Sequence, residues 1–204
     1  MTHFPPNPWG DRRRVRVGLL GGSFNPAHEG HAHVAETALR LLALDEVWLL
    51  VSPQNPLKPV AGMAPLAVRL ASADRVAARH PFIRATAIET RLGTAYTADT
   101  LMALRRRFAK TRFVWLMGAD NLAQMHRWAR WPRIFRAVPV AILARGPYSQ
   151  QALATKVARR FSRSRGTPDG ARSLSEKQPP AWVFLHTRLH PASSTAIRAR
   201  NNNP

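Results

Sequence analysis

Residues 21–31 read GGSFNPAHEGH, and this stretch decides the class of fold. It follows an apolar run at residues 15–21 that is typical of a buried strand, and it leads into residues 29–43, where apolar side chains recur at helical spacing. A second apolar run, VWLLV, follows at residues 47–51. A strand, a helix and a strand of these lengths predict a βαβ unit with parallel pairing and a right-handed crossover.

The same alternation continues along the chain. We expect strands at residues 82–85, 112–117, 138–144 and 182–185, and helices at 65–79, 97–108, from 119 onward, at 150–161 and at 194–200. Repeated units of this kind predict an α/β fold, a Rossmann-like doubly wound parallel sheet with helices on both faces. Ligands of such sheets bind beyond the carboxyl ends of the strands, so chemistry is expected in residues that directly follow a strand.

The domain organisation is predicted to be simple. Residues 1–14 are rich in proline and arginine without apolar periodicity, and we expect a flexible basic N-terminal arm. Residues 15–204 are expected to form a single domain. Within it, the polar and arginine-rich stretch at about 162–180 is predicted to be a mobile loop.

Composition excludes several functional classes. The chain has no cysteine, which removes disulfides, thiol catalysis and Cys-based zinc sites. No apolar run approaches the roughly 20 residues of a membrane span, so we expect a cytoplasmic protein with no membrane partner. The net charge of +20 attracts polyanions in general. The arginine clusters lack interleaved aromatic residues, and we interpret them as solvated surface and not as a nucleic-acid site.

The first motif has the properties of a phosphate-binding turn. Gly21 and Gly22 allow the backbone to turn sharply and to approach a ligand, and the following helix offers free N–H groups and the positive end of its dipole. His28 and His31 are three residues apart and can face the same anion, for which Gly30 leaves room. The spacing is not that of H-E-x-x-H, so a metalloprotease is not expected, and neither a P-loop nor a G-x-G-x-x-G motif is present.

A second polar segment lies near the end of the chain. Residues 193–198 read SSTAIR and follow the last predicted strand. Ser194 and Thr195 at a helix start can serve simply as caps. Together with the forked donor group of Arg198 they also suit a phosphate. Two such segments fit a nucleoside triphosphate, whose α-phosphate and departing β- and γ-phosphates must be held separately.

These two segments carry a family resemblance. Residues 21–31 and 193–198 together resemble the nucleotidylyltransferase superfamily with the H-x-G-H signature. Three further stretches, PQNPLK at 53–58, AYTADTL at 95–101 and the segment 118–128, are similar to bacterial nicotinate mononucleotide adenylyltransferases. The resemblance covers about residues 15–198, with departures at Asn25, where Asp is frequent, and at Leu57, where His is common.

The resemblance implies transfer of the adenylyl group of ATP to nicotinate mononucleotide, which gives deamido-NAD and pyrophosphate. It implies Mg²⁺ carried by ATP, with no metal site of the protein's own. The implied catalytic residues are His28, His31 and Arg198. The implied ATP-binding residues are Gly21, Gly22, Ser23, Phe24, Gly30, Gly118, Asp120, Ser194 and Thr195. The implied substrate-binding residues are Asn55, Lys58, Tyr96, Thr97, Trp128 and Arg145.

Some of these residues have more specific implied roles. Asp120 would bind a ribose, Thr97 would bind the ring carboxylate and Trp128 would stack on the pyridine ring. Lys58 and Arg145 would anchor the phosphate or the carboxylate of the acceptor.

Two alternatives remain open at this point. One is the same transfer to nicotinamide mononucleotide or phosphopantetheine. The other, of a different class, is a basic nucleic-acid-binding protein without enzymatic activity, which leaves both phosphate-binding segments unexplained.

Overall fold

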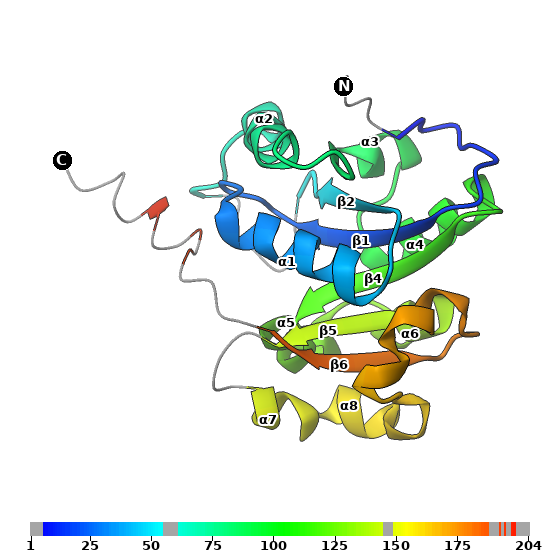
Figure 1. The fold of residues 1–204 in the computed structure, drawn as a ribbon. Helices are drawn as coiled ribbons and strands as arrows, with labels where there is room; N and C mark the ends of the chain where they lie inside the picture. The colour runs from blue at the N-terminus through cyan, green and yellow to red at the C-terminus, as the bar shows by residue number, and fades with distance from the viewer. Residues whose placement is uncertain are drawn as a thin grey trace.

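The computed structural model describes residues 6–54, 61–144 and 149–187, together with Ala192, Ser194, Ile197 and Arg198. Its sheet has six strands, β1 (Arg16–Gly22), β2 (Glu46–Val51), β3 (Ile83–Thr86), β4 (Arg112–Gly118), β5 (Val140–Ala144) and β6 (Trp182–His186) (Figure 1). All neighbours pair in parallel, in the order β3-β2-β1-β4-β5-β6. The chain builds outward from β1 to β3 and then returns to the other side of β1 with β4. The predicted doubly wound fold is confirmed, and its topological switch point lies between β1 and β4.

Helices connect the strands as the pattern predicted, with three differences. Between residues 6 and 187, outside the undescribed ranges 55–60 and 145–148, the α-helices are α1 (Glu29–Leu41), α2 (Leu66–Ala77), α3 (Ile88–Leu92), α4 (Thr97–Arg107), α5 (Ala119–Gln124), α6 (Trp131–Ala137), α7 (Ser149–Leu153) and α8 (Lys156–Arg160). The short helix α3 was not predicted, and the helical stretch expected from residue 119 onward is divided into α5 and α6. The single helix expected at 150–161 is instead two helices, because Thr155 starts a new one by accepting a hydrogen bond from the backbone of Ala158.

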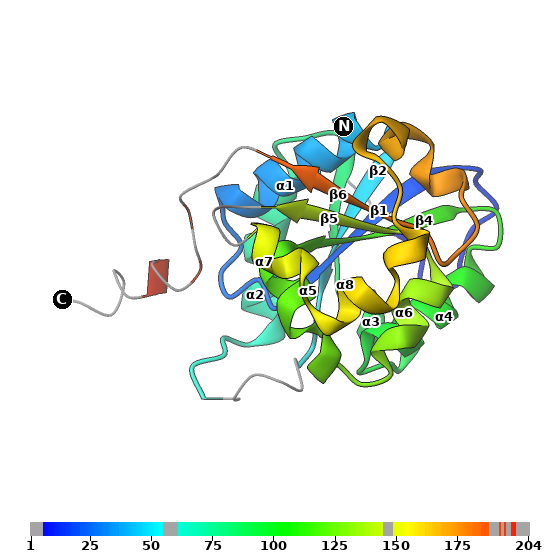
Figure 2. The same ribbon diagram turned by 90° about the horizontal axis from the view of Figure 1, so that it is seen from below.

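The two faces of the sheet bury two separate hydrophobic cores. Along β4, Phe113, Trp115 and Met117 belong to one core, while Val114 and Leu116 belong to the other. This alternation follows from the two-residue period of a strand. Figure 2 shows α1 on one side of the sheet and α4, α6 and α8 on the other, so both faces are covered. Burial on both faces explains why the strands read as continuous apolar runs.

The segment expected to be a mobile loop at about 162–180 is instead packed against the sheet. It contains two 3-10 helices, η2 (Ser162–Ser164) and η3 (Pro168–Glu176). Ala171 and Leu174 of η3 are buried with the core on the α1 side. The prediction of a loop here was wrong, because two apolar residues three positions apart suffice to anchor a 3-10 helix in an otherwise polar stretch.

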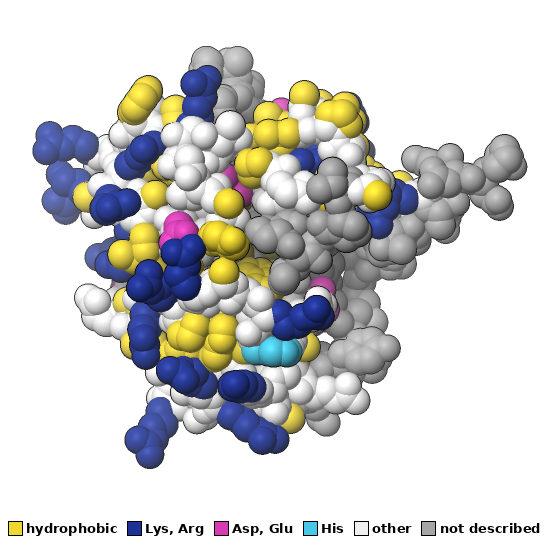
Figure 3. Space-filling view, turned by 180° about the vertical axis from the view of Figure 1, so that it is seen from behind, with side chains coloured by type: hydrophobic (Ala, Val, Ile, Leu, Met, Phe, Trp, Pro, Cys, Tyr) yellow, Lys and Arg dark blue, Asp and Glu magenta, His cyan; other side chains and the backbone are white. Residues whose placement is uncertain are grey.

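Positive charge is spread over the surface. Figure 3 shows Lys and Arg side chains distributed over one face of the molecule, with hydrophobic side chains between them. Several arginines form ion pairs, including Arg16 with Asp45 at 2.7 Å and Arg112 with Glu176 at 3.0 Å. None of the helices in the described part of the chain has the length and hydropathy that a membrane span requires.

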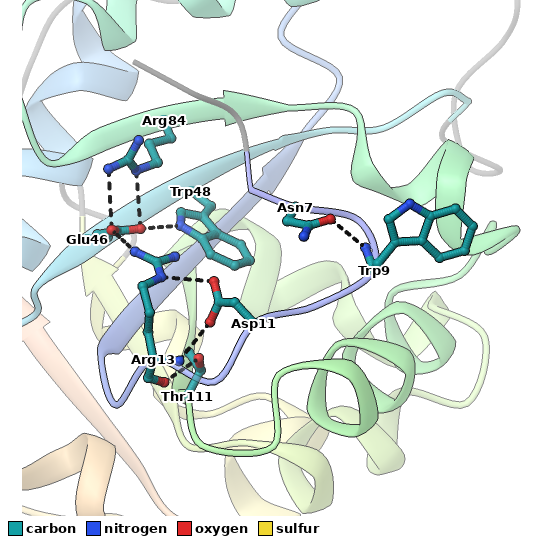
Figure 4. Close-up of polar contacts among 8 residues, drawn as sticks. All are labelled: Asn7, Trp9, Asp11, Arg13, Glu46, Trp48, Arg84 and Thr111. Carbon is teal, nitrogen blue, oxygen red and sulfur yellow. Dashed lines mark hydrogen bonds and ion pairs between the residues drawn. The ribbon is translucent and has the colours of Figure 1, made fainter. Parts of the chain in front are cut away.

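The described part of the N-terminal arm is held against the body of the protein. Glu46, whose side chain is 8% exposed, is 2.6 Å from an Nη atom of Arg13, ion-pairs with Arg84 and accepts a hydrogen bond from the indole of Trp48 (Figure 4). Arg107 of α4 donates to the Pro8 carbonyl at 2.8 Å. Two side-chain contacts thus connect residues 8–13 with β2 and α4, and the flexibility expected of the arm stays a prediction.

Candidate active site

A cavity of about 500 Å³ opens at the carboxyl ends of β1 and β4, where the strand order switches. This is the place at which open α/β sheets bind ligands. The structure brings most of the predicted site residues to its lining. They are Gly21, Gly22, Ser23, Phe24, His28, His31, Tyr96, Thr97, Gly118, Asp120, Trp128 and Ser194.

The two histidines are fixed by the first turn of α1. His28 is the N-cap residue, and its Nδ1 accepts a hydrogen bond from the Gly30 amide at 3.1 Å. Nδ1 of His31 in turn accepts from the His28 amide at 3.2 Å, and the ring centroids lie 3.9 Å apart. Because each Nδ1 is an acceptor, a neutral ring carries its proton on Nε2. The histidines therefore both cap the helix and present N–H donors, which suits an anion.

The glycines of this turn are required by close contacts. A Cβ atom at Gly21 would lie 2.4 Å from the ring of Trp115, and one at Gly30 would lie 2.9 Å from the ring of His28. Between them, Phe24 adopts a left-handed φ of 47°, which is uncommon for a residue with a side chain. Gly30 is buried beneath the histidine pair and does not belong to the cavity lining. The lack of a side chain at Gly30 leaves room for the His28 ring, and its expected role in ATP binding stays a prediction.

The two predicted phosphate-binding segments meet in the fold. The Ser194 hydroxyl donates to the Pro26 carbonyl at 3.0 Å, and Arg198 donates to the Asn25 carbonyl at 2.5 Å. Ser194 lines the cavity, whereas Arg198 is not part of the lining and contacts the loop that precedes α1. Residues more than 160 positions apart in sequence therefore form one end of the site.

Another part of the lining comes from two helix starts and a turn. Gly118 is the N-cap of α5, and Asp120 lies in the first turn of that helix. Tyr96 is the N-cap of α4, which begins at Thr97. Trp128 follows the 3-10 helix η1 (Met125–Arg127) and is partly buried against the core. An aromatic ring, an adjacent hydroxyl and a carboxylate therefore share one cavity with the histidine pair.

Four predicted residues lie outside the described part of the chain. They are Asn55, Lys58, Arg145 and Thr195. Their expected roles thus stay predictions.

Sequence reasoning missed several residues of the lining, including Ser52, Glu89, Asn121 and Arg127. Ser52 directly follows β2, and Glu89 lies just after β3. Glu89 is 9% exposed and accepts a hydrogen bond from Thr100 at 2.9 Å. Burial raises its pKa, although hydrogen bonds from Thr100 and Ser52 oppose the rise. Position after a strand was the signal that could have identified both residues.

One buried cation, Arg69, connects two of the loops that line the cavity. The Arg69 side chain donates to the carbonyls of Ala64, Ser23, Ser52 and Pro53 at 2.7–2.8 Å. Ser23 and Ser52 both line the cavity. Arg69 thereby ties the loop after β1 to the loop after β2.

Across residues 6–54, 61–144, 149–187 and the few described ones beyond, no group of three or more His, Cys, Asp or Glu side chains is placed to hold a metal ion.

The sequence of this chain is similar to those of several known proteins. The family model described as "Cytidylyltransferase-like" matches residues 19–200. A protein of Cereibacter sphaeroides named "Probable nicotinate-nucleotide adenylyltransferase" is 55% identical over 90% of this chain and 96% of its own length. A Caulobacter protein of the same name is 53% identical over 91% of this chain and 98% of its own length.

A solved structure shares the fold at much lower identity. It is the nicotinic acid mononucleotide adenylyltransferase of Plasmodium falciparum complexed with NaAD, with a TM-score of 0.66 and 15% identity, and the match covers 91% of this chain and 83% of that one.

Proposed function

Because the chain belongs to the cytidylyltransferase-like family, we propose that it transfers the adenylyl group of ATP to nicotinate mononucleotide and releases pyrophosphate. The product is deamido-NAD, the nicotinate adenine dinucleotide, and the reaction is a step in NAD biosynthesis. The names of relatives at 53–55% identity support this assignment.

One observation carries the assignment in the structure. The loop before α1 receives hydrogen bonds from Ser194 and Arg198 and leads directly into the neighbouring rings of His28 and His31. Donors suited to a polyphosphate therefore lie around a cavity that is also lined by the aromatic residues Tyr96 and Trp128. A nucleotide-binding site that must also hold a flat pyridine ring with a carboxylate substituent needs this combination.

The proposed chemistry is an in-line displacement at phosphorus. A phosphate oxygen of nicotinate mononucleotide attacks the α-phosphorus of ATP, a new P–O bond forms, and the bond to the β-phosphate oxygen breaks. The electron pair of that bond leaves with pyrophosphate. The attacking oxygen is already anionic, so the protein has to position the groups and stabilise charge, and no general base is required.

The residues divide between the two substrates. We propose that His28 and His31 donate from Nε2 to the phosphates of ATP, with the α1 amides behind them, and that Arg198, Ser194 and Thr195 hold the β- and γ-phosphates. Gly118 and Asp120 would bind the adenosine ribose. Tyr96, Thr97 and Trp128 would enclose the pyridine ring, and Asn55, Lys58 and Arg145 would approach its charged groups.

Magnesium enters this proposal as part of the substrate. ATP would bring Mg²⁺ on its phosphates, where the ion neutralises charge that the histidines and Arg198 also face.

We further propose that residues 15–204 act as one domain. The reaction would take place in the cytoplasm, where ATP is available.

The test is pyrophosphate release from Mg·ATP with nicotinate mononucleotide, nicotinamide mononucleotide and phosphopantetheine offered separately. We expect strong preference for the first. His31→Ala should lower kcat about 100-fold without unfolding the protein, because it removes a charge-stabilising donor. His33→Ala is the control, since His33 is on the same helix but does not line the cavity. Equal activity of the two variants would refute the mechanism, and turnover with another acceptor would refute the choice of substrate.

A further inference from the structure

The proposed nicotinate pocket has two walls that come from separate segments. Tyr96 and Thr97 start α4, whereas Trp128 belongs to the turn between η1 and α6. Both walls line the same cavity, but neither is part of a strand. The spacing between them therefore depends on contacts between α4 and that turn, more than on the sheet.

The side chain of Arg130 spans the two walls. Its guanidinium carbon lies 5.1 Å from the centre of the Tyr96 ring, in the range of a cation–π contact. The same guanidinium places Nη2 at 2.8 Å from Oδ2 of Asp99, in the first turn of α4. Thr97 lies between these two contacts in the chain. One side chain thus holds both sides of the residue that is proposed to bind the ring carboxylate.

The backbone of Arg130 is held in an unusual conformation. Its φ of 55° and ψ of 29° are left-handed, which a residue with a Cβ atom adopts at a cost. Such strain persists where the surroundings hold it, and it is frequent at binding sites. The turn also contains a hydrogen bond from the Trp131 amide to the Trp128 carbonyl at 3.2 Å. The conformation of Arg130 and the position of Trp128 are therefore parts of one turn.

We propose that Arg130 is a positioning residue that sets the width of the nicotinate pocket by holding Tyr96 and Asp99 of α4 against the turn that bears Trp128. This inference rests on the proposed function. Arg130 does not belong to the cavity lining, whereas its neighbours Arg127, Trp128 and Ala129 do. It acts through its neighbours, and its effect falls on the acceptor end of the cavity. The contacts described above for His28, His31 and Ser194, which are proposed to bind the ATP phosphates, are made within the first turn of α1 and with the loop before it.

The experiment compares steady-state kinetics of the wild type, Arg130→Ala, Arg130→Lys and Arg133→Ala. Because the contacts are partly exposed, Arg130→Ala should raise the KM for nicotinate mononucleotide about fivefold and change the KM for ATP less than about twofold. Arg130→Lys keeps the ion pair but loses the planar stacking group, so its effect should be intermediate. Arg133, an exposed arginine of α6, is the matched control and should leave both KM values unchanged.

A double-mutant cycle separates positioning from a general loss of stability. In the Asp99→Asn background, Arg130→Ala should raise the KM for nicotinate mononucleotide by a smaller factor than in the wild type, since the ion pair between Arg130 and Asp99 is already lost. Arg130→Gly removes the same side chain while relieving the left-handed backbone, and it carries the test if the alanine variant does not fold.

The two proposals fail in different ways. Wild-type protein without turnover of nicotinate mononucleotide would refute the proposed function. An active wild type in which Arg130→Ala and Arg130→Gly match Arg133→Ala, or change both KM values equally, would refute the role of Arg130.

Discussion

Replacement of Arg69 by methionine should both destabilise the protein and weaken the binding of both substrates. Arg69 is 2% exposed, and its guanidinium donates four hydrogen bonds to backbone carbonyls. A guanidinium has five N–H donors, so these four backbone carbonyls use nearly all of its capacity. Burial lowers the pKa of Arg69, which reflects the cost of keeping this charge away from water.

The magnitude follows from these contacts. Each charge-assisted hydrogen bond contributes about 1.5–3 kcal/mol, but methionine avoids the desolvation cost of the charge, so we expect a net loss of about 3 kcal/mol. For a domain of this size that corresponds to a fall in Tm of about 9 °C. The KM values should rise as well, because Ser23 and Ser52, whose carbonyls Arg69 binds, both line the cavity.

The assay is thermal unfolding together with the KM for each substrate. Arg75→Met is the matched control, because Arg75 is an exposed arginine of the same helix, α2. Arg69→Lys should fall between the two, since an ammonium group reaches fewer of the carbonyls. If Arg69→Met melted at the temperature of Arg75→Met, the idea that this cation holds the two loops together would be wrong.

Three further predictions concern single side chains. Gly30→Ala should retain the fold but lower kcat about tenfold, because its methyl group would displace the His28 ring; unchanged kcat would contradict this. Burial alone would raise the pKa of Glu46, but hydrogen bonds from Trp48 and Arg13 lower it, so the unfolded chain binds the proton more tightly. Stability should fall as pH drops below about 4.3, and acid titration of Glu46→Gln by circular dichroism should show a shallower loss. For Glu89 the pH dependence of stability runs in the opposite direction, because its pKa is raised in the folded protein. Its contribution to stability is lost as pH rises through that raised pKa, so Glu89→Gln should raise the Tm at neutral pH but not at pH 4. An equal change of Tm at both pH values would exclude this role.

Much of the fold could be predicted because its signals are local. Strands buried on both faces must be continuously apolar, as VWLLV at residues 47–51 is, and this pattern needs no knowledge of neighbours. Sequence patterns were a poorer guide where single distant contacts hold a polar segment. Ala171 and Leu174 pack η3 into the core from within a polar stretch, and Arg13 pairs with Glu46, a buried carboxylate on β2. The groups that these three residues contact lie far away in the sequence.

The two phosphate-binding segments, residues 21–31 and 193–198, could be predicted from the sequence. Their function depends on residue types and short spacings, such as the three positions between His28 and His31. Tertiary structure decided which distant groups meet. It brought Ser194 and Arg198 onto the loop at Asn25 and Pro26, and it placed Glu89 in the lining. It also set Arg130 between Tyr96 and Asp99. The physical reason is that helical and strand periods act over a few residues, whereas the register and order of the parallel strands determine which loops share one edge of the sheet.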